Sequence, residues 1–299
     1  MRALGPRREG AKVIAALATV YVVWGSTYLA IRVMVQSIPP LLGTGARFLA
    51  AAVILAGWVT SRGAADWKIS RREALNASCT GVFILVGGIG LVGVAEQRVP
   101  SAIAAVVIAS IPLWVVLLQA ALGQRPSART LAAVTVGLVG IGAMFWPAGR
   151  FSAETGAMLL LVVAALSTAV GVVFANRAEM PPNPLVAATV EMFVAGIALC
   201  AAAAATGEMQ PEEVAAISAA SLGAFFYLVT AGSLLAYSAF AWLLRNASPS
   251  TVATYAFVNP VVAVILGAVI LDEEITGRML LAAAAIVASV FFVVRTEQQ

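Results

Sequence analysis

A polar and an aromatic residue stand just before a proline in an otherwise apolar segment. Tyr255 and Asn259 are four residues apart, and Pro260 follows directly. Residues at this spacing share one face of a helix, and an interior proline frees a backbone carbonyl group. The pattern predicts a binding site in which Tyr255, Asn259 and exposed backbone meet the polar groups of a small molecule. A hydrogen bond between two helices is the alternative role for Asn259.

A second proline, Pro112, lies mid-way through an earlier apolar segment, 148 residues before Pro260. Interior prolines persist in membrane helices where neighbouring groups or a cavity satisfy the freed carbonyl. Paired breaks in corresponding places of two halves are typical of transporters. We interpret Pro112 and Pro260 as helix breaks or gating points, and Ser110, close to Pro112, as a further candidate for substrate binding.

The first apolar segment carries aromatic rings at Tyr21, Trp24 and Tyr28, a spacing that places them on one helical face. Such a stripe can stack on a substrate, and we take Trp24 and Tyr28 as candidate binding residues. Tyrosine and tryptophan also gather at membrane surfaces, so an interfacial anchor is the alternative.

Two ionisable residues, Arg47 and Glu191, lie inside apolar segments. Charged groups in a membrane are costly and are functional hypotheses by default. Counting along their helices puts them roughly 8 to 9 Å from opposite membrane faces, so a direct salt bridge is not expected. Arg47 is predicted to extend its long side chain to the nearer interface. Glu191 is a possible amine or proton site.

The sequence lacks the residues that several kinds of chemistry require. The chain has no histidine, the usual proton shuttle near neutral pH, and no phosphate-binding loop of the G-x-x-x-x-G-K-[ST] type. An enzyme would need a nucleophile with its base, paired carboxylates or metal ligands, and the sequence shows none of these sets. We therefore expect no enzyme activity, no cofactor and no metal.

The elements that position these residues are apolar helices. Hydrophobic residues make up 62% of the 299 positions and charged residues only 11%, which excludes a soluble globule. Segments long enough to cross a bilayer lie near residues 13–31, 42–60, 75–95, 101–122, 130–147, 156–175, 185–206, 223–244, 250–271 and 279–295. The sequence thus predicts an all-α membrane protein with ten transmembrane helices.

Basic residues set the expected orientation. Thirteen of the 18 Lys and Arg residues fall on the side of the N-terminus and four on the other, so both termini should be cytoplasmic.

The two halves, residues 1–149 and 150–299, match in hydropathy. With five helices each, the second half must be inverted, which places a site at the interface of the repeats. The expected partners are the bilayer and a small molecule, with no nucleic acid; the chain is a monomer or a homodimer.

Several motifs resemble one family over the whole chain. They are Trp24-Gly25-Ser26, Pro40 followed by Arg47-Phe48, and Ala247-Ser248-Pro249 through Tyr255 and Pro260 to Leu271-Asp272-Glu273-Glu274. This pattern is similar to the EamA-type, ten-helix branch of the drug/metabolite transporter superfamily, and most of all to aromatic amino-acid exporters of the YddG type. The resemblance implies a bacterial inner-membrane carrier that works by alternating access. It also implies a central cavity, with the fifth and tenth helices at the periphery.

The function expected from these observations is export of amino acids, aromatic or hydrophobic ones with broad specificity, and of related metabolites. Without a charged pair at mid-depth, the site would bind weakly through Asn259, exposed backbone and water. Efflux of drug-like cations and flipping of a lipid-linked substrate are alternatives within transport. A membrane scaffold without transport is the alternative from another class.

Overall fold

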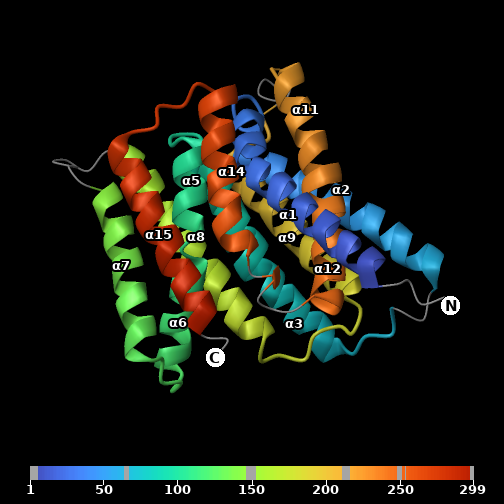
Figure 1. The fold of residues 1–299 in the computed structure, drawn as a ribbon. Helices are drawn as coiled ribbons and strands as arrows, with labels where there is room; N and C mark the ends of the chain where they lie inside the picture. Colours follow the sequence, from blue (N-terminus) through green and yellow to red (C-terminus); the bar gives the residue numbers. More distant parts are fainter. Residues whose placement is uncertain are drawn as a thin grey trace.

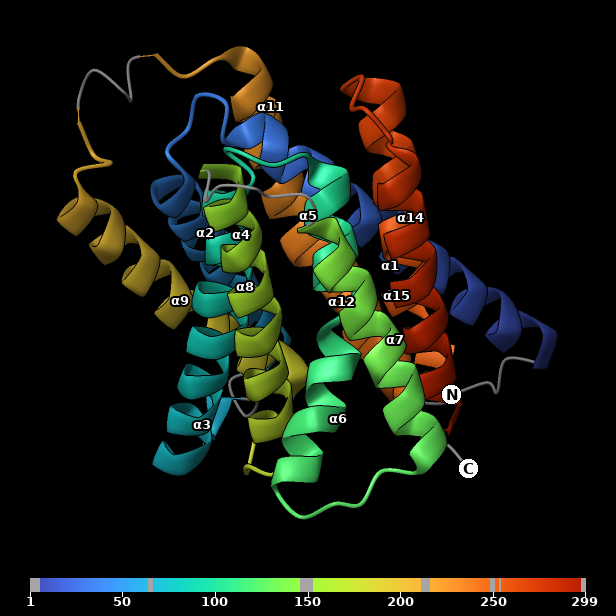
Figure 2. The same ribbon diagram turned by 90° about the vertical axis from the view of Figure 1, so that its left-hand side faces the viewer.

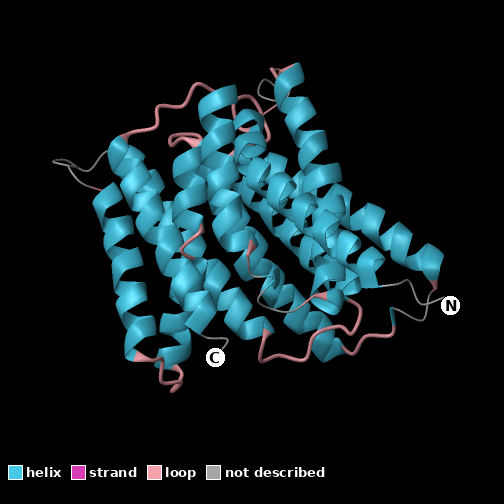
Figure 3. Ribbon diagram, viewed as in Figure 1, coloured by secondary structure: helices cyan, strands magenta, loops and turns pink. Residues whose placement is uncertain are grey.

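Helices form all the regular structure of the described chain (Figures 1 and 3). The computed structural model describes residues 6–63, 67–145, 153–210, 216–247, 251–252 and 254–296. The first half contains α1 (Pro6–Met34), α2 (Pro40–Arg62), α3 (Arg71–Gly81), η2 (Val82–Gly90), α4 (Leu91–Ala95), α5 (Ser101–Ile108), α6 (Ile111–Ala121) and α7 (Ala128–Met144). The second half contains α8 (Ala153–Ala175), α9 (Pro184–Thr206), α11 (Ala219–Tyr227), η3 (Leu228–Ala236), α12 (Tyr237–Asn246), α14 (Tyr255–Ile270) and α15 (Gly277–Thr296).

These elements build the ten predicted spans. Within the described residues, eight helical segments are long and apolar enough to cross a membrane, and α7 and α14 are two shorter apolar helices. The predicted all-α membrane fold is confirmed. The boundary predicted between residues 149 and 150 lies outside the described residues and stays a prediction, as does the cytoplasmic side of the termini.

Large apolar side chains cover the outside of the bundle. Leu281 is 75% exposed, Val269 74%, and Val53 and Val139 each 66%. A soluble protein would not leave so many such residues in water, whereas lipid tails solvate them at no cost. The exposed surface is therefore the one expected of a protein embedded in a bilayer.

Two spans contain a π-helical stretch at corresponding places in the two halves. η2 interrupts the third span between α3 and α4, and η3 interrupts the eighth between α11 and α12. The glycine-rich sequence of the third span favours this departure from α-helical geometry, because glycine weakens an α-helix. π-Helical turns occur frequently at functional sites, and both stretches face the interior described below.

At one end of the bundle, where α2 and α5 begin, two glutamates bind the N-termini of these helices. We call this end the distal face; α1 begins and α15 ends at the opposite face, the terminal face (Figure 1). The carboxylate of Glu208, after α9, accepts hydrogen bonds of 2.9 and 3.1 Å from Leu41 and Leu42 N–H groups at the start of α2. Glu273, after α14, accepts bonds of 2.7 and 3.0 Å from Ser101 and Ala102 N–H at the start of α5.

Each glutamate follows a residue with left-handed backbone conformation. Gly207 has φ 82° and Asp272 has φ 53°, values that glycine adopts freely and aspartate tolerates. The turn directs each carboxylate to a helix N-terminus, where unpaired N–H groups and the helix dipole favour an anion. The same device thus joins α9 to α2 and α14 to α5.

Helices α7 and α15 pack side by side along one edge of the bundle (Figures 1 and 2). Small residues allow this approach: a β-carbon placed on Gly140 would lie 3.2 Å from that of Ala285. This arrangement agrees with the peripheral position that the resemblance implies for the fifth and tenth helices.

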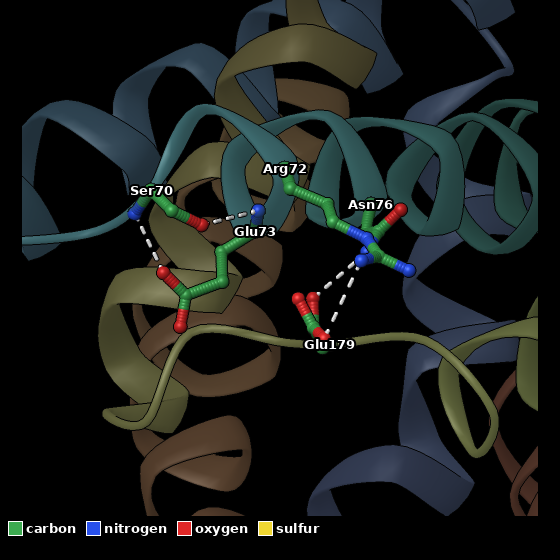
Figure 4. A network of polar contacts seen from close by, with 5 residues as sticks. All are labelled: Ser70, Arg72, Glu73, Asn76 and Glu179. Carbon is green, nitrogen blue, oxygen red and sulfur yellow. Dashed lines mark hydrogen bonds and ion pairs between the residues drawn. The ribbon is translucent and has the colours of Figure 1, made fainter.

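The terminal face carries a polar network around the start of α3 (Figure 4). Ser70 and Glu73 form a reciprocal capping box that satisfies the first N–H groups of the helix. Arg72 forms an exposed ion pair of 3.5 Å with Glu179, and Asn76 donates a 2.9 Å hydrogen bond to the Glu179 carbonyl. The ion pair itself contributes little in water, but the contacts fix the loop between α8 and α9.

Gly81 allows α3 to cross α9 at backbone distance, next to the candidate site. A β-carbon placed on Gly81 would lie 2.6 Å from the carbonyl oxygen of Glu191 and 2.7 Å from its α-carbon. We expect Gly81→Ala to destabilise the protein by about 1 to 3 kcal/mol through overpacking. Gly142→Ala in α7, where no atom lies within 4 Å, should be neutral or stabilising by up to about 1 kcal/mol. Thermal unfolding in detergent measures both, and equal melting temperatures would contradict the prediction.

Candidate functional site

A cavity of about 370 Å³ lies inside the bundle. Its wall is formed by both halves of the chain: α1, α2, η2, α4, α5 and α6 from the first, and α8, α9, η3, α12 and α14 from the second. Within the described chain, α7 and α15 supply none of the lining residues. The volume is at the small end of the range for ligand pockets, about 300 to 1,000 Å³. The cavity is therefore of a size for one small molecule.

Three aromatic rings from different helices meet in the cavity wall. The ring centroid of Trp24 (α1) lies 5.0 Å from that of Phe240 (α12) and 5.4 Å from that of Tyr255 (α14), and the last two are 5.6 Å apart. We call these residues the aromatic cluster. Trp24 Nε1 also donates a 3.3 Å hydrogen bond to the Gly232 carbonyl in η3, which fixes the indole ring.

Apolar packing continues from the aromatic cluster toward the terminal face. Val20 of α1, Leu243 of α12 and Val252 are buried together beneath it. Trp24, Phe240 and Tyr255 pack against these residues and also line the cavity.

The candidate residues around the ninth span line the cavity. Tyr255, Asn259 and Pro260 are all part of the wall, together with Trp24 and Tyr28 of α1. Asn259 is only 8% exposed, and its Oδ1 atom has no hydrogen-bond partner among the described residues. The predicted helix break at Pro260 is not found: α14 runs without interruption from Tyr255 to Ile270, with Pro260 inside the helix.

The predicted break near Pro112 is present, but Ser110 does not take the predicted place. The fourth span divides into α5 and α6 between Ile108 and Ile111, and Pro112 lines the cavity. Ser110 is fully buried and is not part of the lining. Its hydroxyl donates a 2.6 Å hydrogen bond to the Val107 carbonyl and accepts one of 3.1 Å from Trp114 Nε1. The hydroxyl is thus used within its own helix turn rather than in substrate binding.

Arg47 does not extend to the membrane interface, contrary to the expectation from its depth. It is 4% exposed and lines the cavity. Its Nε atom donates a 2.9 Å hydrogen bond to Ser233 Oγ in η3, and the guanidinium carbon lies 5.1 Å from the centre of the Phe48 ring. The hydroxyl in η3 and the ring hold the side chain inside the bundle.

Glu191 lines the same cavity, so both ionisable residues face one interior space. It is 7% exposed, and the hydroxyl of Tyr237 is its hydrogen-bonding neighbour. Arg47 and Glu191 line one cavity but form no direct ion pair, since the ion pair found among the described residues joins Arg72 and Glu179.

The sequence did not point to Ser233, Tyr237 and Phe240 as cavity residues, because one hydroxyl or ring in an apolar helix is no distinctive signal.

A helical membrane bundle around an aromatic-lined cavity is typical of multi-pass membrane transporters. The chain belongs to the EamA-like transporter family, which it matches twice in succession, over residues 11–146 and 155–295. The two matches suggest repeated halves. Membership places the protein among transporters and not among enzymes.

Known relatives agree with this assignment. The chain is 37% identical over 279 residues to the uncharacterized inner membrane transporter YedA of Escherichia coli K12, covering 93% of this chain and 89% of the relative. It is 26% identical over 299 residues to the probable amino-acid metabolite efflux pump of the same organism, covering 95% and 94%. A crystal structure with 18% identity shares the fold with a TM-score of 0.63 over 96% of this chain and 98% of that one.

These findings make the protein a multi-pass inner-membrane transporter. The narrower resemblance to YddG-type exporters stays a prediction.

Proposed function

We propose that this protein exports amino acids, aromatic or hydrophobic ones with broad specificity, and related metabolites across the inner membrane by alternating access. The observation that carries the proposal is the combination of the aromatic cluster with the buried, unpartnered Oδ1 of Asn259 in one cavity. Aromatic rings supply apolar contact area for a side chain, and a few fixed polar groups orient the ligand. The relative described as a probable amino-acid metabolite efflux pump supports the same substrate class.

Counterflow into liposomes that contain the purified protein tests the proposal. We expect uptake of labelled phenylalanine, methionine and threonine. Asn259→Ala should lower this uptake roughly tenfold or more, since a hydrogen bond to a charged group is worth about 1.5 to 3 kcal/mol. Asn246→Ala, on an exposed residue at the end of α12, is the matched control and should leave uptake unchanged. An imposed pH gradient separates facilitated from proton-coupled movement.

The alternatives give different results in the same assay. Uptake of none of the amino acids would overturn the proposal. Competition by cationic dyes but not by amino acids would favour drug efflux, for which the cavity-lining Glu191 offers a carboxyl group. Flipping of a fluorescent lipid would favour the lipid-linked alternative.

A further inference from the structure

The cavity holds two buried polar atoms of opposite kind that lack a partner among the described residues. One is the Nη1 atom of Arg47, a donor, and the other is the Oδ1 atom of Asn259, an acceptor. An unsatisfied buried polar group costs about 1 to 3 kcal/mol, and a charged one costs more. A ligand with both an acceptor and a donor would satisfy both atoms at once.

The arrangement of Arg47 leaves one side of the guanidinium group for a ligand. Ser233 accepts the hydrogen bond from Nε at 2.9 Å, and a β-carbon placed on Gly232 would lie 3.3 Å from Nη2. A larger residue at position 232 would therefore crowd the guanidinium group. Held at Nε by Ser233, Arg47 offers the unpartnered Nη1, and a carboxylate is the usual partner of a guanidinium group.

The carboxyl group of Glu191 lies on the same part of the cavity wall. Its neighbour Tyr237 follows Ser233, the partner of Arg47, by four residues, which is about one helical turn. A basic and an acidic side chain thus contact neighbouring turns of a single span. Such a wall matches a molecule with one positive and one negative group better than it matches a simple cation or anion.

We propose that Arg47 binds the carboxylate of a zwitterionic amino acid, that Asn259 and Glu191 receive its ammonium group, and that the aromatic cluster holds its side chain. This inference rests on the proposed function and names the recognition chemistry of the same site. It makes Arg47 the residue that distinguishes an amino acid from the amine that lacks the carboxylate.

Inhibition of phenylalanine counterflow by two analogues tests the inference on the unchanged protein. Phenethylamine lacks the carboxylate, and 3-phenylpropionate lacks the ammonium group. Each analogue should be a weaker inhibitor than unlabelled phenylalanine by about tenfold or more, because each loses one charge-assisted contact. Equal inhibition by all three compounds would overturn the inference while amino-acid transport itself stands. No counterflow of any amino acid would overturn the proposed function and this inference together.

Substitution of Arg47 assigns the carboxylate contact. Arg47→Gln should weaken inhibition by phenylalanine about tenfold or more and leave inhibition by phenethylamine unchanged, so that the two become similar. Arg98→Gln removes the same charge from an exposed position before α5 and should change neither. An unaltered preference for phenylalanine in folded Arg47→Gln protein would overturn the inference. If Arg47→Gln does not fold, the same inhibition assay is made with Arg47→Lys. That result and the analogue series on the unchanged protein then decide whether the inference stands.

Discussion

Replacement of Glu273 by alanine is expected to lower the melting temperature of the purified protein by roughly 5 to 15 °C. The carboxylate of Glu273 accepts hydrogen bonds from the N–H groups of Ser101 and Ala102, and both of those residues are fully buried. Removal leaves two buried donors unsatisfied, at a cost of about 1 to 3 kcal/mol each. It also frees the start of α5, which forms part of the cavity wall.

The neighbouring glutamate provides a matched control. Glu274 is exposed, and Glu274→Ala removes the same charge without a buried contact, so its melting temperature should stay within about 1 °C. Glu208→Ala, which removes the equivalent contact at the start of α2, should resemble Glu273→Ala. If Glu273→Ala and Glu274→Ala unfold at the same temperature, the carboxylate cap does not stabilise the distal face.

The motif around Glu273 has a structural reason that the sequence alone did not reveal. The left-handed conformation of Asp272 turns the chain so that Glu273 reaches α5. Gly267 leaves room for it, since a β-carbon there would lie 2.5 Å from Glu273 Oε2. The sequence marked Leu271 to Glu274 only through its resemblance to a family. The contact depends on a residue 172 positions earlier in the chain, which local patterns do not encode.

Period and spacing predicted much of the fold and of the cavity lining. A segment that crosses lipid must be apolar and must satisfy its own backbone hydrogen bonds as a helix. Hydropathy therefore identifies the ten spans. Trp24, Tyr28, Tyr255 and Asn259 were found because rare polar and aromatic groups on one helical face are conspicuous. Their role in binding stays a prediction.

Other residues could not be placed from the sequence. Arg47 was predicted to extend to the membrane interface from its depth in a single helix. A count along one helix does not include the hydroxyl of Ser233, which another span supplies. Ser110 looked available, yet serine in a helix often bonds to a carbonyl of the preceding turn, as it does here with Val107.

Glu96 was also missed, because it directly follows the third span and reads as a loop residue. It is 0% exposed, and neither of its carboxyl oxygens has a hydrogen-bond partner among the described residues. Its backbone carbonyl accepts a hydrogen bond from Arg32. Burial raises the pKa of Glu96 well above its usual range, the charge of Glu273 raises this pKa further, and the charge of Arg32 opposes the change. Tyr28 is a further titratable neighbour.

A raised pKa makes stability depend on pH with a definite sign. The folded protein holds the Glu96 proton more tightly than the unfolded chain, in which the pKa is about 4.3. The resulting stabilisation is complete below that value and is lost as the pH rises through the folded pKa, by about 1.4 kcal/mol for each unit of pKa difference. We expect the melting temperature to fall between pH 5 and pH 9, and Glu96→Gln, which has no proton to lose, to reduce this fall. Glu274→Gln, on an exposed residue, should keep the slope of the unchanged protein. The variants are compared by the slope of melting temperature against pH, because a buried amide at position 96 has its own cost in stability. Parallel curves for Glu96→Gln and the unchanged protein would show that another group governs the pH response.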